Sequence, residues 1–150
     1  MAIKLLGLDI GDARIGLAKG ELGFSFVFGR GYITRSAPND DIAKLKEITQ
    51  DEQIDVLVVG LPSRTDGKDS AQTQKVRAFA KTLEDAGFKV ELEDERFTTK
   101  LASERLQQGV SKKKRQEKGR LDEASAVLIL ESYLKRKNAE NDRCIRNKVD

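Results

Sequence analysis

The 150-residue sequence contains no histidine and a single cysteine, Cys144. The lack of histidine excludes Ser-His-Asp and Cys-His catalysis, and it excludes zinc or non-haem iron sites with histidine ligands. One cysteine cannot form a disulfide framework or a thiolate zinc cluster, which favours a reducing, cytoplasmic setting. Any catalysis must therefore depend on carboxylates, lysine, arginine, hydroxyls or a metal ion that such groups hold.

Long apolar runs are also missing. No run approaches the roughly 18 residues typical of a membrane-spanning helix, and the N-terminus lacks the order of a signal peptide. We therefore expect a soluble cytoplasmic protein with no membrane partner, as a monomer or a homodimer. The length and the 38% hydrophobic content fit one compact domain, which we expect over residues 1–137, followed by a polar, disordered tail at 138–150.

Tryptophan is absent, and only 5% of the residues are aromatic, which argues against recognition of nucleic acid through extensive base stacking. The formal net charge of +3 is distributed unevenly. Basic residues dominate the segments 111–120 and 135–150, whereas the rest of the chain carries a net negative charge. This asymmetry indicates a polyanionic partner that binds at a defined place.

Apolar periodicity and turn residues predict a mixed α/β sheet. Predicted strands cover 3–10, 13–21, 24–35, 54–62 and 88–94, and predicted helices cover about 39–52, 70–87, 98–108 and 121–136. Three strands followed by alternating helices and strands predict five strands, the first three antiparallel, with helices on both faces of the sheet. The buried segments 3–10 and 54–62 should be neighbouring parallel strands.

Three acids occupy unusual positions in this scheme. Asp9 interrupts an apolar strand, Glu95 follows the last predicted strand, and Asp122 begins the last predicted helix. Sites in α/β sheets gather at the carboxyl ends of parallel strands, so the three acids can meet there. Clustered carboxylates without histidine are suited to Mg²⁺ or Mn²⁺, and two such ions can activate a water and neutralise the leaving oxygen of a phosphodiester.

Two of these acids also have structural explanations. Asp122 fits the first turn of a helix because of the helix dipole, and Glu95 fits an ion pair with Arg96 or a helix cap. Asp9 is different, because a carboxylate inside an apolar strand is costly unless something pairs with it. The glycines that follow Asp9 suit a tight turn or a close approach of the backbone to phosphate.

Four sequence blocks resemble one known family. The blocks GLDIGDARIGLA, VVGLPSRTDG, DERFTT and LDEASAVLIL occur in the order and spacing of the YqgF/RuvX family, also called pre-16S rRNA nucleases and Holliday junction resolvase-like proteins. The resemblance implies a ribonuclease H-like fold, dependence on a divalent metal, and maturation of the 5′ end of small-subunit ribosomal RNA. It also implies that the acidic triad of the family falls on Asp9, Glu95 and Asp122. Departures from the family pattern occur after residue 18, at Ser63 and Arg64, and at Ser125, none of them in the triad.

Basic residues near the acids are candidates for phosphate contacts, because guanidinium groups bind phosphate in a bidentate manner. Arg14 lies beside the glycine turn and Arg96 beside Glu95, although ordinary ion pairs explain either arginine equally well. The segment before the Asp122 helix adds a predicted basic loop that can grip a nucleic-acid backbone: Lys112, Lys113, Lys114 and Arg115.

The sequence thus predicts a metal-dependent endonuclease that acts on structured RNA, with branched DNA as an alternative substrate. A non-catalytic nucleic-acid-binding module of the same fold is a further alternative, although it would not need all three acids. An actin-like phosphotransferase is disfavoured, because that fold needs two related domains and a second phosphate hairpin.

Overall fold

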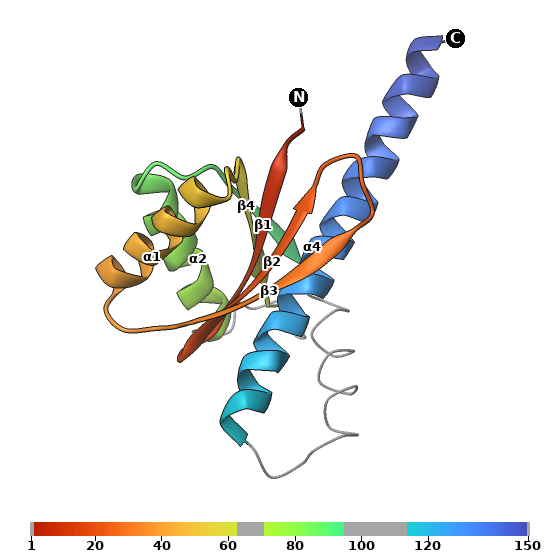
Figure 1. The fold of residues 1–150 in the computed structure, drawn as a ribbon. Coiled ribbons are helices and arrows are strands. Elements are labelled where there is room, and N and C mark those ends of the chain that lie inside the picture. The colour runs from red at the N-terminus through yellow and green to blue at the C-terminus, as the bar shows by residue number, and fades with distance from the viewer. Residues whose placement is uncertain (1, 63–70, 95–113, 150) are drawn as a thin grey trace.

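A computed structural model describes residues 2–62, 71–94 and 114–149, with side chains in the last range described for 120–140. Within this part of the chain, one sheet has the strand order β3-β2-β1-β4-β5 (Figure 1). The strands are β1 (Lys4–Ile10), β2 (Arg14–Glu21), β3 (Val27–Thr34), β4 (Val56–Leu61) and β5 (Val90–Asp94).

The strand directions confirm the predicted topology. The strands β1, β2 and β3 form an antiparallel meander, while β1 pairs in parallel with β4 and β4 in parallel with β5. The carboxyl ends of β1, β4 and β5 therefore lie along one edge of the sheet. This edge is where an α/β sheet usually carries its site.

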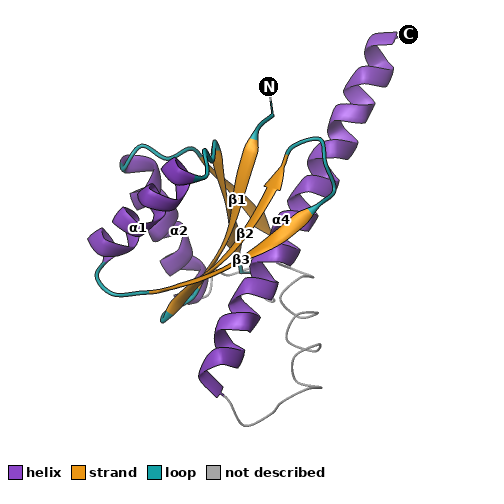
Figure 2. Cartoon of the chain, viewed as in Figure 1, coloured by secondary structure: helices purple, strands orange, loops and turns teal. Residues whose placement is uncertain are grey.

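Helices cover both faces of the sheet (Figure 2). Helices α1 (Pro38–Asp51) and α2 (Ala71–Asp85) lie on one face, and the long helix α4 (Lys114–Val149) crosses the other. Asn39 and Asp40 are of residue types that commonly cap helices, but the N-cap of α1 is Ala37, which makes no side-chain cap bond. Pro38 starts the helix, where its fixed φ fits and no amide is needed. Gly87 follows α2 with a φ of 102°, as expected for a residue that ends a helix.

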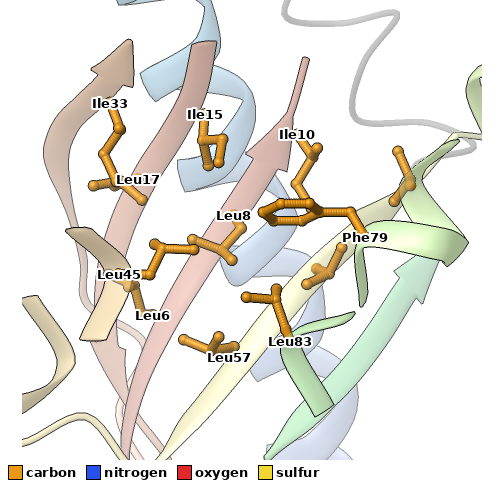
Figure 3. Packing of buried hydrophobic residues seen from close by; sticks show 12 residues of the cluster. Leu6, Leu8, Ile10, Ile15, Leu17, Ile33, Leu45, Leu57, Phe79 and Leu83 are labelled. Atoms are coloured by element: carbon orange, nitrogen blue, oxygen red, sulfur yellow. The ribbon is translucent and has the colours of Figure 1, made fainter. Parts of the chain in front are cut away.

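The face under α1 and α2 is held by large aliphatic side chains. Alternate residues of β1, namely Leu6, Leu8 and Ile10, pack with Leu45 of α1 and with Phe79 and Leu83 of α2 (Figure 3). Because strand side chains alternate between faces, Leu5, Gly7 and Asp9 belong to the opposite face. The apolar run of β1 is therefore buried on both sides.

The face under α4 has a second hydrophobic core. Leu5, Ala18 and Val58 of the sheet pack against Ala126 and Leu130 of α4. Gly7 lies close beneath the same helix: a Cβ at this position would be 3.1 Å from the carbonyl oxygen of Ala126. Helix α4 therefore rests almost directly on the backbone of the central strands.

Helix α4 is longer at both ends than the sequence predicts. Its range Lys114–Val149 includes Lys114 and Arg115, which we expected in a loop, and most of the segment 138–150, which we expected to be disordered. Lys, Arg, Gln and Glu at the start of α4 favour helix, whereas residues 138–149 contain three asparagines and have little helix preference of their own. This second segment continues a helix that is already packed, which costs much less than starting one. Arg136 and Lys137 also pair with Glu140 at helical spacing. The predicted helix at 98–108 lies outside the described residues. No helix in the described part of the chain has the length and apolar character needed to cross a membrane.

Candidate active site

The first hairpin presents Asp9 at the carboxyl end of β1. Asp9 is the next-to-last residue of the strand and pairs with Gly16 of β2, so both residues lie on the face of the sheet that α4 covers. The chain then turns at Gly11, whose N–H donates a hydrogen bond of 2.9 Å to the carbonyl oxygen of Arg14. The turn is tight because of the glycine, and it leaves Asp9 only partly buried at the edge of the sheet.

Gly16 allows α4 to reach this edge. A Cβ on Gly16 would lie 1.9 Å from the carbonyl oxygen of Asp122, which is far inside van der Waals contact. Only a residue without a side chain permits this approach of helix backbone to strand backbone. Because Asp9 and Gly16 are cross-strand partners, the contact brings Asp122 to the same place on the sheet as Asp9.

Arg14 completes the arrangement. Its Nε donates to Oδ2 of Asp122 at 2.9 Å, and the two side chains are 22% and 19% exposed. Burial raises the pKa of Asp122, and the hydrogen bond and charge of Arg14 only partly oppose this effect. Asp122 is thus a partly desolvated carboxylate on a residue whose backbone lies against the cross-strand partner of Asp9, which makes it a candidate for binding a cation.

Glu123, next to Asp122, fixes α4 to the edge strand. A bulge in β3 places Gly29 and Tyr32 opposite Ala18 and Gly16. The carboxylate of Glu123 accepts a hydrogen bond from the N–H of Gly31 and lies against Gly29. Sequence reasoning missed this role of Glu123, although the two glycines of β3 were a signal for it.

Arg35 supports the hairpin from the other side of the sheet. Its Nη1 donates to the carbonyl oxygen of Gly11 at 2.7 Å, its Nε donates to the fully buried Asp41 at 3.1 Å, and its guanidinium lies 4.8 Å from the ring centroid of Phe79. Gln72 adds a hydrogen bond of 3.2 Å to the carbonyl oxygen of Ile10. Sequence reasoning missed these positioning residues, because nothing local to Arg35 shows that it spans two helices and a turn.

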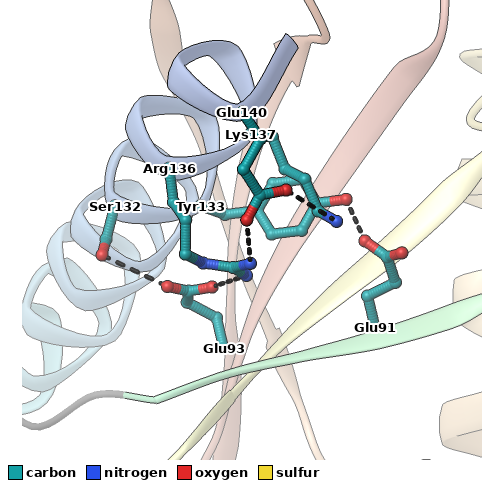
Figure 4. A network of polar contacts seen from close by, with 7 residues as sticks. All are labelled: Glu91, Glu93, Ser132, Tyr133, Arg136, Lys137 and Glu140. Carbon is teal, nitrogen blue, oxygen red and sulfur yellow. Dashed lines mark hydrogen bonds and ion pairs between the residues drawn. The ribbon is translucent and has the colours of Figure 1, made fainter. Parts of the chain in front are cut away.

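A polar network ties β5 to α4 (Figure 4). Glu93, buried on β5, accepts hydrogen bonds from Arg136 at 2.6 Å and from Ser132 at 3.3 Å. Glu91 on the same strand accepts a hydrogen bond from the Tyr133 hydroxyl. The network holds the carboxyl end of β5, which directly precedes Glu95 in the sequence, against the helix that carries Asp122.

The structure brings the backbones of two of the three predicted acids, Asp9 and Asp122, to the same place on the sheet, with Arg14 bonded to the second. Glu95 and Arg96 lie outside the described residues, as do Lys112 and Lys113. Lys114 and Arg115 begin α4, and their side chains are not described. Within the described residues, no group of three or more Asp, Glu, His or Cys side chains could hold a metal ion. The two carboxylates nevertheless have the hard oxygen donors that Mg²⁺ and Mn²⁺ require.

A separate apolar groove lies at the opposite end of the strands. It has a volume of about 350 Å³ and is lined by Lys4, Lys19, Phe24, Phe26 and Phe28, among others. Lys4 begins β1, whereas Asp9 is near its end, and the even-numbered residues of β1 face α1 and α2. The groove is therefore distinct from the edge that carries the acids.

The family of the chain follows from comparison with known proteins. The model of the family described as "RuvX: Holliday junction resolvase" matches residues 3–136. The chain belongs to the RuvX family. Among RuvX relatives, a "Putative pre-16S rRNA nuclease" of Thermus thermophilus is 51% identical over 134 residues, which cover 89% of this chain and 98% of that protein. A protein of the same description from Sphingopyxis alaskensis is 42% identical and covers 87% of this chain and 86% of its own.

Solved structures show the fold of this RuvX-family chain. Thermus thermophilus RuvC in complex with a Holliday junction matches with a TM-score of 0.54 and 12% identity, and covers 91% of this chain and 98% of RuvC. A Fowlpox virus resolvase bound to Holliday junction DNA matches with a TM-score of 0.54 and 12% identity, and covers 89% of this chain and 98% of that chain. The five-stranded mixed sheet is thus a RuvC-like ribonuclease H fold, as the resemblance implies.

Proposed function

We propose that this RuvX-family protein is an endonuclease that depends on Mg²⁺ or Mn²⁺ and hydrolyses phosphodiester bonds in structured nucleic acid, with the 5′ end of pre-16S ribosomal RNA as its substrate. The observation that carries the proposal is that the backbones of Asp9 and Asp122 come to one place at the carboxyl edge of the sheet, where Gly16 lets α4 approach. The names of its relatives support the nuclease activity and the RNA substrate.

The residues divide into those that hold a metal and those that hold phosphate. Asp9 and Asp122 supply carboxylate oxygens, and Glu95, which directly follows β5, is the third ligand in the proposal. When bound, the metal would activate a water and neutralise the leaving oxygen of the phosphodiester. Arg14 lies next to this point, and its guanidinium is suited to a non-bridging phosphate oxygen.

The sequence next to the site residues suits a polyanionic substrate. Lys112 and Lys113 directly precede α4 in the sequence, Lys114 and Arg115 are its first two residues, and Arg96 follows Glu95. In the proposal these cations bind the backbone on either side of the cleaved bond, and their contribution weakens with added salt. Branched DNA is the second candidate substrate, favoured by the description of the family and by the junction-bound proteins of similar fold.

The test is a cleavage assay on two substrates, a pre-16S rRNA fragment and a four-way DNA junction. Each is incubated with Mg²⁺, with Mn²⁺ or with chelator, using the parent protein and Asp9→Asn. We expect metal-dependent cleavage of the RNA that is lost in Asp9→Asn, because asparagine keeps the shape of the side chain but removes its charge. Nucleic-acid binding by the variant should be largely retained.

Asp12→Asn is the matched control. Asp12 lies in the same hairpin, with its side chain 71% exposed and 3.4 Å from Nζ of Lys75. Cleavage that survives Asp12→Asn and not Asp9→Asn would assign the activity to the site. Preferential cleavage of the junction would make the protein a resolvase, and binding without cleavage under every condition would make it a non-catalytic module.

A further inference from the structure

The side chain of Asp122 already has a cationic partner inside the protein. Nε of Arg14 lies 2.9 Å from Oδ2 of Asp122, in a place where both side chains are about four-fifths buried. At this distance and burial the attraction is much stronger than that of an exposed ion pair. A metal ion that binds Asp122 must therefore approach a carboxylate that Arg14 holds.

Two cations cannot share this carboxylate without cost. A divalent ion on Asp122 would lie within several ångströms of the guanidinium, and repulsion between them is weakly screened away from bulk water. Arg14 has only a short path to another position, because it begins β2 and its backbone is fixed by the hydrogen bond from Gly11. Its side chain can swing away from Asp122 while its backbone stays in the sheet.

We propose that Arg14 is an internal counter-ion of Asp122 that metal binding displaces, and that the displaced guanidinium becomes the phosphate contact of the site. This inference rests on the proposed function, since it takes Asp122 as a metal ligand. It adds an order of events: the protein neutralises Asp122 with Arg14, the metal takes over that carboxylate, and only then does Arg14 turn to the substrate.

The guanidinium group of Arg14 has the chemical properties that this role requires. A guanidinium remains charged under all ordinary conditions and carries five N–H donors in a planar fork, so it can exchange a carboxylate for a phosphate without gaining or losing a proton. Lysine has the charge but not the fork. The substitutions Arg14→Lys and Arg14→Gln therefore separate the charge from the geometry.

The first experiment follows the Nε–H group of Arg14 by ¹⁵N NMR while the full-length protein is titrated with Mg²⁺. The resonance is identified as the one missing from the spectrum of Arg14→Lys. We expect it to shift and to exchange faster with water over the same Mg²⁺ range that shifts the backbone amides of Asp9 and Asp122. The Asp9→Asn variant should show a weaker response of the whole set.

Two results would overturn the inference in distinguishable ways. If the amides of Asp9 and Asp122 respond to Mg²⁺ while the Nε–H of Arg14 does not change, the metal binds and Arg14 is not displaced. If neither the amides nor the Nε–H respond when Mg²⁺ is added, or when Ca²⁺ is added in its place, the metal site is absent. The proposed function then fails together with this inference.

The second experiment measures Mn²⁺ affinity by calorimetry, without nucleic acid. Arg14→Gln should bind Mn²⁺ more tightly, on the order of fivefold, because the metal no longer competes with an ion pair of intermediate burial. Arg14→Lys should fall between this variant and the parent. Arg30→Gln is the control, since Arg30 pairs with Glu52 on the other face of the sheet and should leave the affinity unchanged. Unchanged or weaker Mn²⁺ binding by a folded Arg14→Gln protein would overturn the inference.

Discussion

The two faces of the sheet are packed by different means. Under α1 and α2, large side chains such as Leu6, Leu8 and Leu45 fill the space between the layers. Under α4, glycines let helix and strand backbones touch, most closely at Gly16, and acids such as Asp122 and Glu123 bond to the sheet. The difference shows how one small sheet provides both stability and a charged site. One face is packed by large aliphatic side chains, and the other combines a second hydrophobic core with close backbone contacts at glycines.

The comparison can be broken most severely at Gly16. In Gly16→Ala the new Cβ would meet the carbonyl of Asp122, and neither backbone can yield as a flexible side chain would. We expect a loss of about 3 kcal/mol or more in the free energy of unfolding, measured by urea denaturation, and loss of cleavage in whatever fraction remains folded. Gly23→Ala is the control: it meets nothing nearby and suffers only from its φ of 96°, at about 1 kcal/mol. Equal losses in the two variants would contradict the close approach.

A cavity on the face covered by α1 and α2 should lower the stability of the fold without changing the candidate site. Leu45 is fully buried between α1 and the sheet, so Leu45→Ala should cost about 3 kcal/mol of stability because of the lost contacts and the cavity. Cleavage per folded molecule should remain at the parent rate when it is measured well below the melting temperature. A loss of activity beyond the unfolded fraction would show that the two faces are not separable.

A smaller effect is expected where α4 meets β5. Arg136→Met leaves the carboxylate of Glu93 buried without its strongest partner. Since Arg136 itself is half exposed, we expect a loss of about 1–2 kcal/mol, between the values for exposed and buried pairs. Arg136→Lys should cost less because it retains the charge. Equal stability of the parent and Arg136→Met in thermal and urea denaturation would show that the contact of Arg136 with Glu93 does not stabilise the fold.

The smallest effect should appear as a pH dependence at Asp122. Burial raises the pKa of Asp122, so the native state binds its proton more tightly than the unfolded chain does. Ionisation of Asp122 therefore lowers the stability of the parent as the pH rises through this raised pKa, and Asp122→Asn lacks that loss. The free energy of unfolding of the variant minus that of the parent should increase as the pH rises from the ordinary pKa of aspartate through the raised pKa of Asp122, and then become constant. A difference that is constant or that decreases over this range would contradict the sign.

Much of the fold was predictable because local signals agreed with each other. Apolar alternation and the turn at Gly11 identify β1 and β2, and the succession of strands and helices gives the mixed sheet. The ends of α4 could not be predicted in this way. A polar segment such as 138–149 has no apolar signal of its own, and it continues a helix that is packed elsewhere.

The candidate site was likewise predictable in part from local sequence signals. The sequence alone singled out Asp9, because an acid in an apolar strand demands a partner, and it supplied Asp122 and Arg14 as candidates. Only the tertiary structure decided that Asp122 lies beside Asp9, that Arg14 bonds to Asp122, and that Glu123 and Arg35 support them from two sides. The physical reason is that a buried charge shows its cost in the local sequence, whereas its partners are chosen by contacts between segments more than a hundred residues apart, such as Arg14 and Asp122.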